Sequence, residues 1–254
     1  MRRSLVPALA VGLTALLTAC GTAGDAHPAP AASAPASTAT TVVADPVAAI
    51  RQAFDRSLER TVTLDVTISA AGQTVTMRSA VEPATGRMTL HMKTPEPITM
   101  AVTQDAVYVQ QDESDGKPWV KLDRDRLRPE GQLAQGLEIR AQAGILGGVV
   151  SAERTGDGRY TGVADSEKAV AAATSESQRA TLRNAFKVIR QKSVPFEVTL
   201  DAEGRLTMLT YTFDTAAGAL GNELKLHSFG EPLAISVPPA SETEDAAAEV
   251  YRYF

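Results

Sequence analysis

The stretch that decides the fold is TVTLDVTISAAGQTVTMRSAVEPATGRMTLHMK, residues 61–93, where large apolar side chains recur at every second position. Its first segment, TVTLDVTIS, alternates aliphatic residues with threonine, serine and aspartate, so that one face of an extended chain is apolar. The same period of two returns in QTVTMRSAV, after a turn at Ala71 and Gly72, and again in RMTLHMK. Such alternation predicts antiparallel strands with one buried face and one face in water.

Helical segments flank these strands. Asp45 as the cap and Pro46 in the first turn predict a helix that reaches Arg60. Apolar residues four apart predict a second helical segment over 133–146, and a capping box of Ser175 and Gln178 predicts a third. Further strands are expected at 98–103, 106–110, 119–122, 149–154, 159–164, in a hairpin over 196–213, and at 222–229. Runs of strands with helices between them indicate an α+β domain, with helices on one face of a large antiparallel sheet.

The first nineteen residues have the pattern of an export signal. Arg2 and Arg3 precede an uncharged run that ends in small residues at Ala19. A membrane-spanning helix needs about 20 apolar residues, whereas this run is shorter and contains Pro7. Residues 1–19 are therefore expected to be a signal peptide and not a transmembrane anchor.

Cys20 is the only cysteine, and the segment Leu17 to Cys20 resembles the lipobox of bacterial lipoproteins. The resemblance implies that Cys20 is acylated and becomes the mature N-terminus, which would hold the exported chain in membrane lipid on the outer face of the cell membrane. The alternative is a stray cysteine in an ordinary signal peptide. Residues 20–44 are rich in Ala, Pro, Ser and Thr and are expected to form a disordered tether.

Composition limits the remaining functions. Residues 45–238 suit one medium-sized domain, and residues 239–254 form an acidic, alanine-rich tail that is expected to be disordered or one short helix. The chain has 25 basic and 30 acidic residues, so loss of Arg2 and Arg3 with the signal leaves 23 against 30, a charge near −7. This balance argues against nucleic acid as a partner. With Cys20 acylated, no thiol is left for a disulfide.

Catalytic motifs do not occur in the sequence. It contains no G-x-S-x-G, H-E-x-x-H, P-loop or C-x-x-C pattern. His91 and His227 alternate with apolar neighbours and are expected to point outward into solvent, and His27 lies in the tether. The chain is therefore predicted to be no enzyme, with no cofactor and no metal site.

Four short segments carry a family resemblance: AVYVQ (106–110), WVKLD (119–123), RYTG (159–162) and VTLDAEGRL (198–206). In this order, behind a lipobox and a tether, they resemble the LppX/LprAFG family of envelope lipoproteins and, more loosely, LolA-like proteins. The resemblance implies a half-barrel, in which a large curved antiparallel sheet has helices packed on its concave face. It also implies an apolar cavity that binds or carries lipids or lipid-linked molecules, with an acyl chain or a glycolipid as ligand.

The inward-facing apolar residues of the strands are the candidate lining of such a cavity. They are Val62, Leu64, Val66, Ile68, Val75, Met77, Met88, Leu90, Met92, Ile98 and Met100. Methionine adapts to varied apolar partners, but at alternating strand positions it is also ordinary core. Two other interpretations stay open. One is a LolA-like sensor without lipid cargo, whose acidic tail and terminal aromatic residues contact a membrane regulatory protein, and the other is a surface lipoprotein with a filled core.

Overall fold

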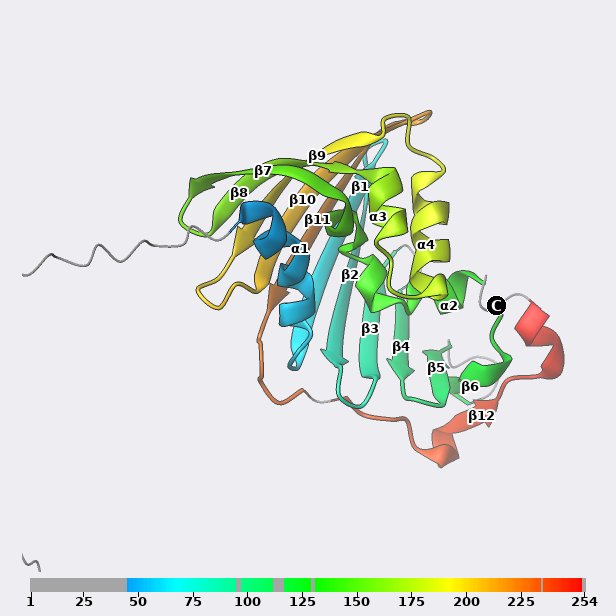
Figure 1. Cartoon of the computed structure of the whole chain (residues 1–254). Coiled ribbons are helices and arrows are strands. Elements are labelled where there is room, and N and C mark those ends of the chain that lie inside the picture. Colours follow the sequence, from blue (N-terminus) through cyan, green and yellow to red (C-terminus); the bar gives the residue numbers. More distant parts are fainter. Residues whose placement is uncertain (1–44, 95–96, 112–116, 129–130, 234, 253–254) are drawn as a thin grey trace, which may run out of the picture. The chain divides into compact units, whose positions relative to one another are not determined.

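The computed structural model describes residues 45–94, 97–111, 117–128, 131–233 and 235–252. The predictions for the signal peptide (1–19) and for Cys20 and the tether (20–44) lie outside the described residues. The described chain forms one large sheet with helices on one side of it (Figure 1).

Twelve strands of the described residues form this sheet in the order β12-β6-β5-β4-β3-β2-β1-β11-β10-β9-β8-β7. Their bounds are β1 Val62–Ala70, β2 Gln73–Glu82, β3 Arg87–Lys93, β4 Ile98–Val102, β5 Ala106–Gln110, β6 Trp119–Asp123, β7 Val149–Gly156, β8 Arg159–Asp165, β9 Ser193–Leu200, β10 Leu206–Thr215, β11 Gly218–His227 and β12 Thr243–Asp245. All neighbouring strands are antiparallel except β12, which runs parallel to β6. The sheet is therefore mixed, with the predicted antiparallel pairing everywhere except at this edge.

The register places the alternating residues as the sequence predicts. Val66 lies opposite Met77, and Met77 lies opposite Met92, so that one apolar row crosses three strands. Directly paired residues share a face of a sheet, and the threonines between them face the other way. Alternation by itself was enough to assign the two faces of β1, β2 and β3.

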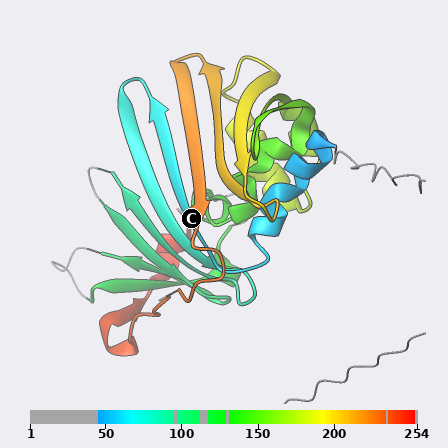
Figure 2. The same ribbon diagram turned by 90° about the vertical axis from the view of Figure 1, so that its left-hand side faces the viewer.

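The sheet curves, and the helices lie on its concave side (Figures 1 and 2). Helix α1 (Pro46–Ser57) packs against β7, β9 and β10. It begins as predicted, because the Asp45 side chain accepts a hydrogen bond from the Val47 backbone N–H at 3.0 Å. The predicted α+β half-barrel with helices on its concave face is the observed fold class.

The segment predicted as one helix over 133–146 is instead broken into α2 (Gln132–Gly136) and the 3-10 helices η3 (Ile139–Ala141) and η4 (Gly144–Gly148). Glycine weakens a helix interior, and Gly136 ends α2. At the start of η4, a side-chain Cβ on Gly144 would lie 2.5 Å from Cδ2 of Leu182, so α4 packs closely on this glycine.

Two helices follow the hairpin of β7 and β8. Helix α4 (Glu176–Phe186) begins as the capping box predicts, with the Gln178 N–H donating to Ser175 Oγ at 3.0 Å. The sequence did not predict helix α3 (Ser166–Ala171), which is capped by Asp165. Ile189 lies beyond α4 and forms a bridge with Thr215.

The C-terminal segment is neither disordered nor a single short helix where it is described. It forms η5 (Ala240–Glu242), β12 and η6 (Ala248–Arg252) along the edge strand β6. Tyr251 is 8% exposed, and its hydroxyl accepts a hydrogen bond from the Asp123 backbone N–H at 2.9 Å. The Arg126 guanidinium lies 3.8 Å from the centre of the Tyr251 ring. An edge strand presents unpaired backbone groups, and here the tail covers them.

Within the ranges that the structure describes, no helix combines the length and the apolar character needed to cross a membrane.

Candidate functional site

An apolar cavity of about 410 Å³ lies between strands β1–β4 and the helical segment that follows Gly131. On the strand side, its lining consists of Val66, Ile68, Val75, Met77, Leu90, Met92 and Met100. On the helical side, its lining consists of Leu133, Gly136, Leu137 and Gln142. None of these residues is charged, so the cavity suits an uncharged, largely hydrocarbon group.

The strand wall follows directly from the pairing. Leu90 lies opposite Met100, and Met92 lies between Met77 and Ile98 in the neighbouring row. Three of the wall residues are methionines, whose unbranched thioether side chains adapt to groups of different shape. The opposite wall is short and irregular, because α2 has only five residues and ends at a glycine.

The eleven predicted lining residues divide into three groups in the structure. Seven of them line the cavity, as given above. Val62, Leu64 and Met88 lie deeper, at 0%, 1% and 5% exposure, within the continuous hydrophobic core. Ile98 is partly buried opposite Met92 but does not line the cavity. The alternation is the same along each strand. Whether an inward-facing residue lines the cavity or belongs to the core depends on which segment of the chain covers it.

The helical side of the lining was missing from the prediction. Leu133 and Leu137 belong to the apolar stripe seen in the sequence, so a signal was present for these two residues. Gly136 and Gln142 carried no such signal. Gly136 is the last residue of α2, and Gln142 directly follows η3.

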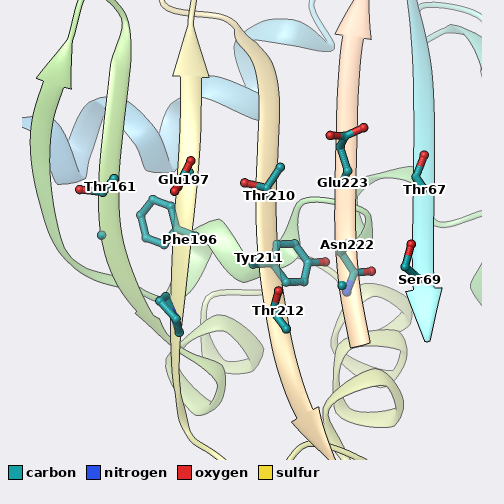
Figure 3. Close-up of a pocket in the computed structure, with 13 residues that line it drawn as sticks. Thr67, Ser69, Thr161, Phe196, Glu197, Thr210, Tyr211, Thr212, Asn222 and Glu223 are labelled. Atoms are coloured by element: carbon teal, nitrogen blue, oxygen red, sulfur yellow. The ribbon is translucent and has the colours of Figure 1, made fainter. Parts of the chain in front are cut away.

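A second hollow, of about 550 Å³, lies over the outer face of the sheet across β1, β11, β10, β9 and β8 (Figure 3). Its outward-facing side chains are small and polar or carboxylic: Thr67, Ser69, Thr161, Glu197, Thr210, Thr212 and Glu223. Hydroxyl and carboxylate groups do not favour hydrocarbon. The outer hollow therefore differs in chemistry from the cavity under the sheet.

The outer face also carries a cluster of charged and polar side chains formed by Asp65, Arg78 and His227. Arg78 donates two hydrogen bonds to Asp65, at 2.6 and 3.0 Å, and this lowers the pKa of the Asp65 carboxyl. His227 Nε2 lies 3.1 Å from Asp65, and His227 Nδ1 lies 3.2 Å from the Ser228 hydroxyl. These side chains lie on the face opposite the cavity. Among the described residues, no group of three or more His, Cys, Asp or Glu is placed to hold a metal ion.

Comparison with known proteins gives matches to solved structures alone. No family model matches the chain, and no curated protein matches it. The lipoprotein LppX of Mycobacterium tuberculosis is similar at 14% identity and a TM-score of 0.44, over 75% of this chain and 97% of that one. An uncharacterized conserved protein from Thermus thermophilus is similar at 12% identity and a TM-score of 0.40, over 78% and 97% of the two chains.

A LolA superfamily protein from Nitrosomonas europaea is similar at 11% identity and a TM-score of 0.30, over 81% of this chain and 94% of that one. The first and third of these structures are of the LppX and LolA kinds that the sequence resembles. Similarity at this level of identity concerns the fold, so the ligand has to be inferred from the residues of this chain.

Proposed function

We propose that this protein is an exported lipoprotein, anchored on the outer face of the cell membrane through acylated Cys20, that binds the acyl chains of lipids or lipid-linked molecules. The observation that carries the proposal is the uncharged cavity of about 410 Å³ beneath β1–β4. Its volume lies within the range of about 300–1,000 Å³ that is usual for ligand pockets.

The mechanism is physical and requires no bond to be made or broken. Each methylene that leaves water for an apolar environment gains about 0.8 kcal/mol. The wall offers aliphatic and thioether groups only on the strand side, and Ile68 at 38% exposure keeps an apolar surface open to an entering chain. A disordered tether between Cys20 and residue 45 would give the domain reach from the bilayer.

Adjacent residues on opposite faces of β2 provide the test. Met77→Trp places an indole in the cavity, whereas Thr76→Trp places the same group on the outer face. Both changes are made in the full chain with Cys20→Ser, and co-purifying lipid is measured by native mass spectrometry and by organic extraction. We expect lipid on the parent and on Thr76→Trp, and a loss of at least fivefold on Met77→Trp. A parent chain that carries no lipid under gentle conditions contradicts the proposal.

The anchor has its own test. Cys20→Ser is expected to move the mature chain from the membrane fraction to the soluble fraction, with lipid binding by the domain unchanged. Persistence of the Cys20→Ser chain in the membrane fraction contradicts anchoring through this residue.

The alternative of a sensor that contacts a membrane protein through its tail receives no support from the described contacts. Tyr251 is buried against β6 and is held by Asp123 and Arg126, so it is not free for a partner. Tyr253 and Phe254 lie outside the described residues. Cross-linking in membranes separates the two functions, because a sensor captures one dominant protein and loses it when the terminal aromatic residues are removed.

A further inference from the structure

A basic stretch of sequence runs from α4 into β9. Residues 177–196 contain five arginines and lysines and no acidic residue, whereas the whole chain has 25 basic and 30 acidic residues. The five are Arg179, Arg183, Lys187, Arg190 and Lys192. In a protein with a net negative charge, such a local excess of positive charge marks the surface that an anionic partner approaches.

Four of these side chains gather around one hollow. It has a volume of about 440 Å³ and lies between α3, the end of α4 and the segment that leads into β9. Its charged lining residues are four cations and one carboxylate: Arg183, Lys187, Arg190, Lys192 and Glu167. Arg183 and Lys192 each pair with a glutamate at 2.7 Å. Lys187 and Arg190 form no ion pair with any residue of the described ranges, so their charges are available to a group from outside.

An exposed apolar side chain lies among these cations. Val188 is 56% exposed, more than any other large hydrophobic residue in the described part of the chain. It belongs to the basic segment, residues 187–192, and lies between Lys187 and Arg190. Cations next to an exposed aliphatic group suit the surface of an anionic bilayer, where the charges meet lipid phosphates and the apolar group reaches the acyl boundary. A small soluble anion would gain nothing from Val188.

The basic segment lies at the end of the sheet where the cavity wall is exposed. Ile68, which lines the cavity and is 38% exposed, comes two residues before the end of β1. Ala70 at that end pairs with Leu220, close to the turn between β10 and β11. Ile189 of the basic segment forms a bridge with Thr215 at the same turn. Figure 1 shows the end of α4 and the tips of these strands together at the top of the view.

Hydrogen bonds connect the basic segment to the helical wall of the cavity. Lys187 Nζ donates to the Asn184 side-chain oxygen at 2.8 Å, and Asn184 Nδ2 donates to the Gln135 side-chain oxygen at 3.1 Å. Gln135 directly precedes Gly136, which lines the cavity. Lys187 is therefore two side chains away from a residue of the cavity wall.

We propose that the basic segment docks the domain on the anionic lipid headgroups of a bilayer, with the cavity end of the sheet turned toward the membrane. Lys187 and Arg190 contact lipid phosphates, and Val188 enters the boundary between headgroups and acyl chains. The acidic remainder of the surface is repelled by the same bilayer, so docking also fixes the orientation of the domain. Docking needs no bound cargo. Its role, the passage of an acyl chain between bilayer and cavity, rests on the proposed function.

Vesicle binding tests the docking. The mature chain, residues 20–254 with Cys20→Ser, has neither the export signal nor an acyl anchor, so that its binding to vesicles comes from the protein surface. Partition onto phosphatidylcholine vesicles with and without phosphatidylglycerol is measured by flotation at low and at physiological salt. We expect the parent to bind the phosphatidylglycerol vesicles at least about tenfold more tightly, and this preference to fall as the salt concentration rises.

Charge reversal at two ends of the molecule provides a matched pair of variants. Lys187→Glu with Arg190→Glu reverses two exposed cations of the basic segment. Arg154→Glu with Arg159→Glu makes the same change in net charge on exposed residues at the turn between β7 and β8, and Arg159 pairs with Thr199 at the far end of β9. The first double variant is expected to lose at least about tenfold in binding to phosphatidylglycerol vesicles, and the second less than about threefold.

A thiol label reports which surface meets the lipid. Cys20 is the only cysteine, so Val188→Cys creates a single labelling site in the Cys20→Ser chain. An environment-sensitive fluorophore at residue 188 is expected to shift its emission to shorter wavelength on phosphatidylglycerol vesicles. Val237→Cys is the control, because Val237 is 40% exposed and follows Ile235, whose carbonyl oxygen accepts a hydrogen bond from Arg87 at the opposite end of the sheet. A label at residue 237 is expected to show no shift.

The outcomes separate docking from cargo binding. Equal partition of the parent onto the two kinds of vesicle, or equal losses in the two double variants, overturns the docking. A shift at residue 237 without one at residue 188 also overturns it, because another surface then meets the bilayer. A chain that co-purifies with lipid but shows no preference for phosphatidylglycerol overturns the docking alone. A chain that docks as expected but carries no lipid under gentle conditions overturns the proposed function and leaves the docking supported.

Discussion

The two halves of the sheet have the same alternation of apolar residues along their strands, but one half covers a filled core and the other borders a cavity. In the half formed by β7–β10, α1 packs on the concave face, and Leu209 of β10 and Val198 of β9 are 0% and 1% exposed. In the half formed by β1–β4, a short broken helical segment stands over the strands, and Ile68 is 38% exposed at the cavity. Alternating apolar residues therefore specify a face, and what covers each residue of that face decides whether the residue becomes core or cavity wall.

The largest expected difference between the two halves is in the stability lost when one apolar side chain of each half is shortened to alanine. Leu209→Ala is expected to lower the free energy of unfolding by about 3 to 4 kcal/mol, because it opens a void in a closed core. Met77→Ala removes a similar volume from a residue that already borders a cavity, and we expect a loss of about 1 kcal/mol. Urea unfolding of both variants measures the difference. Equal losses mean that the two halves are packed alike.

Two glycines, Gly148 in a closely packed segment and Gly136 at the cavity, are expected to show a smaller difference in stability when each is replaced by alanine. A Cβ on Gly148 would lie 2.8 Å from the Ala169 backbone nitrogen and closer still to the Asp165 carbonyl oxygen. Gly148→Ala is therefore expected to destabilise the chain by about 2 to 3 kcal/mol. Around Gly136, which lines the cavity, a Cβ would meet no atom within 4 Å.

Gly136→Ala in α2 is accordingly expected to raise stability by about 0.5 kcal/mol, since alanine favours a helix over glycine. Thermal unfolding by calorimetry measures both variants. A melting temperature of Gly148→Ala at or above that of the parent contradicts the close packing of η4 against α3.

The smallest expected effect comes from the outer face. The Arg78 guanidinium holds the pKa of Asp65 below its ordinary value, with a further contribution from His227. A lowered folded-state pKa stabilises the fold above the unfolded pKa of about 3.9, and this stabilisation is lost as the pH falls through the folded pKa. Because the Arg78 side chain is 65% exposed, Asp65→Asn is expected to lower stability at pH 7 by less than about 1 kcal/mol.

Urea unfolding of Asp65→Asn and the parent at pH 7 and at pH 2.5 checks this sign. The difference between the two chains is expected to shrink at the lower pH, because the stabilisation that the Asp65 carboxylate provides is lost as this group becomes protonated. A difference that grows toward acid pH contradicts a lowered pKa.

Local sequence patterns predicted the elements whose signals are complete within a few residues. The alternation over 61–93 gave three strands and their buried faces, Asp45 with Pro46 gave the start of α1, and Ser175 with Gln178 gave the start of α4. The same patterns failed where distant packing decides. The stripe over 133–146 resembles one helix, but the structure divides it into α2, η3 and η4, and Gly144 packs against Leu182 of α4.

The C-terminal segment failed for the same reason. Its alanine-rich, acidic sequence has no strand signal, and Thr243–Asp245 becomes a strand only because β6 offers an unpaired edge. Tyr251 is then fixed by partners more than a hundred residues earlier in the sequence, Asp123 and Arg126.

The sequence by itself determined which residues of β1–β4 face the apolar side, because side chains alternate along a strand with a period of two whatever packs above them. Tertiary structure alone decided that Val66, Ile68 and five further strand residues line a space while Val62, Leu64 and Met88 are core. It also decided that Asn222, an unremarkable polar residue in the sequence, comes to lie beside Ile68 with a buried amide nitrogen that has no partner among the described residues. The physical reason is that burial depends on what covers a side chain, and the covering segments lie far away in the sequence.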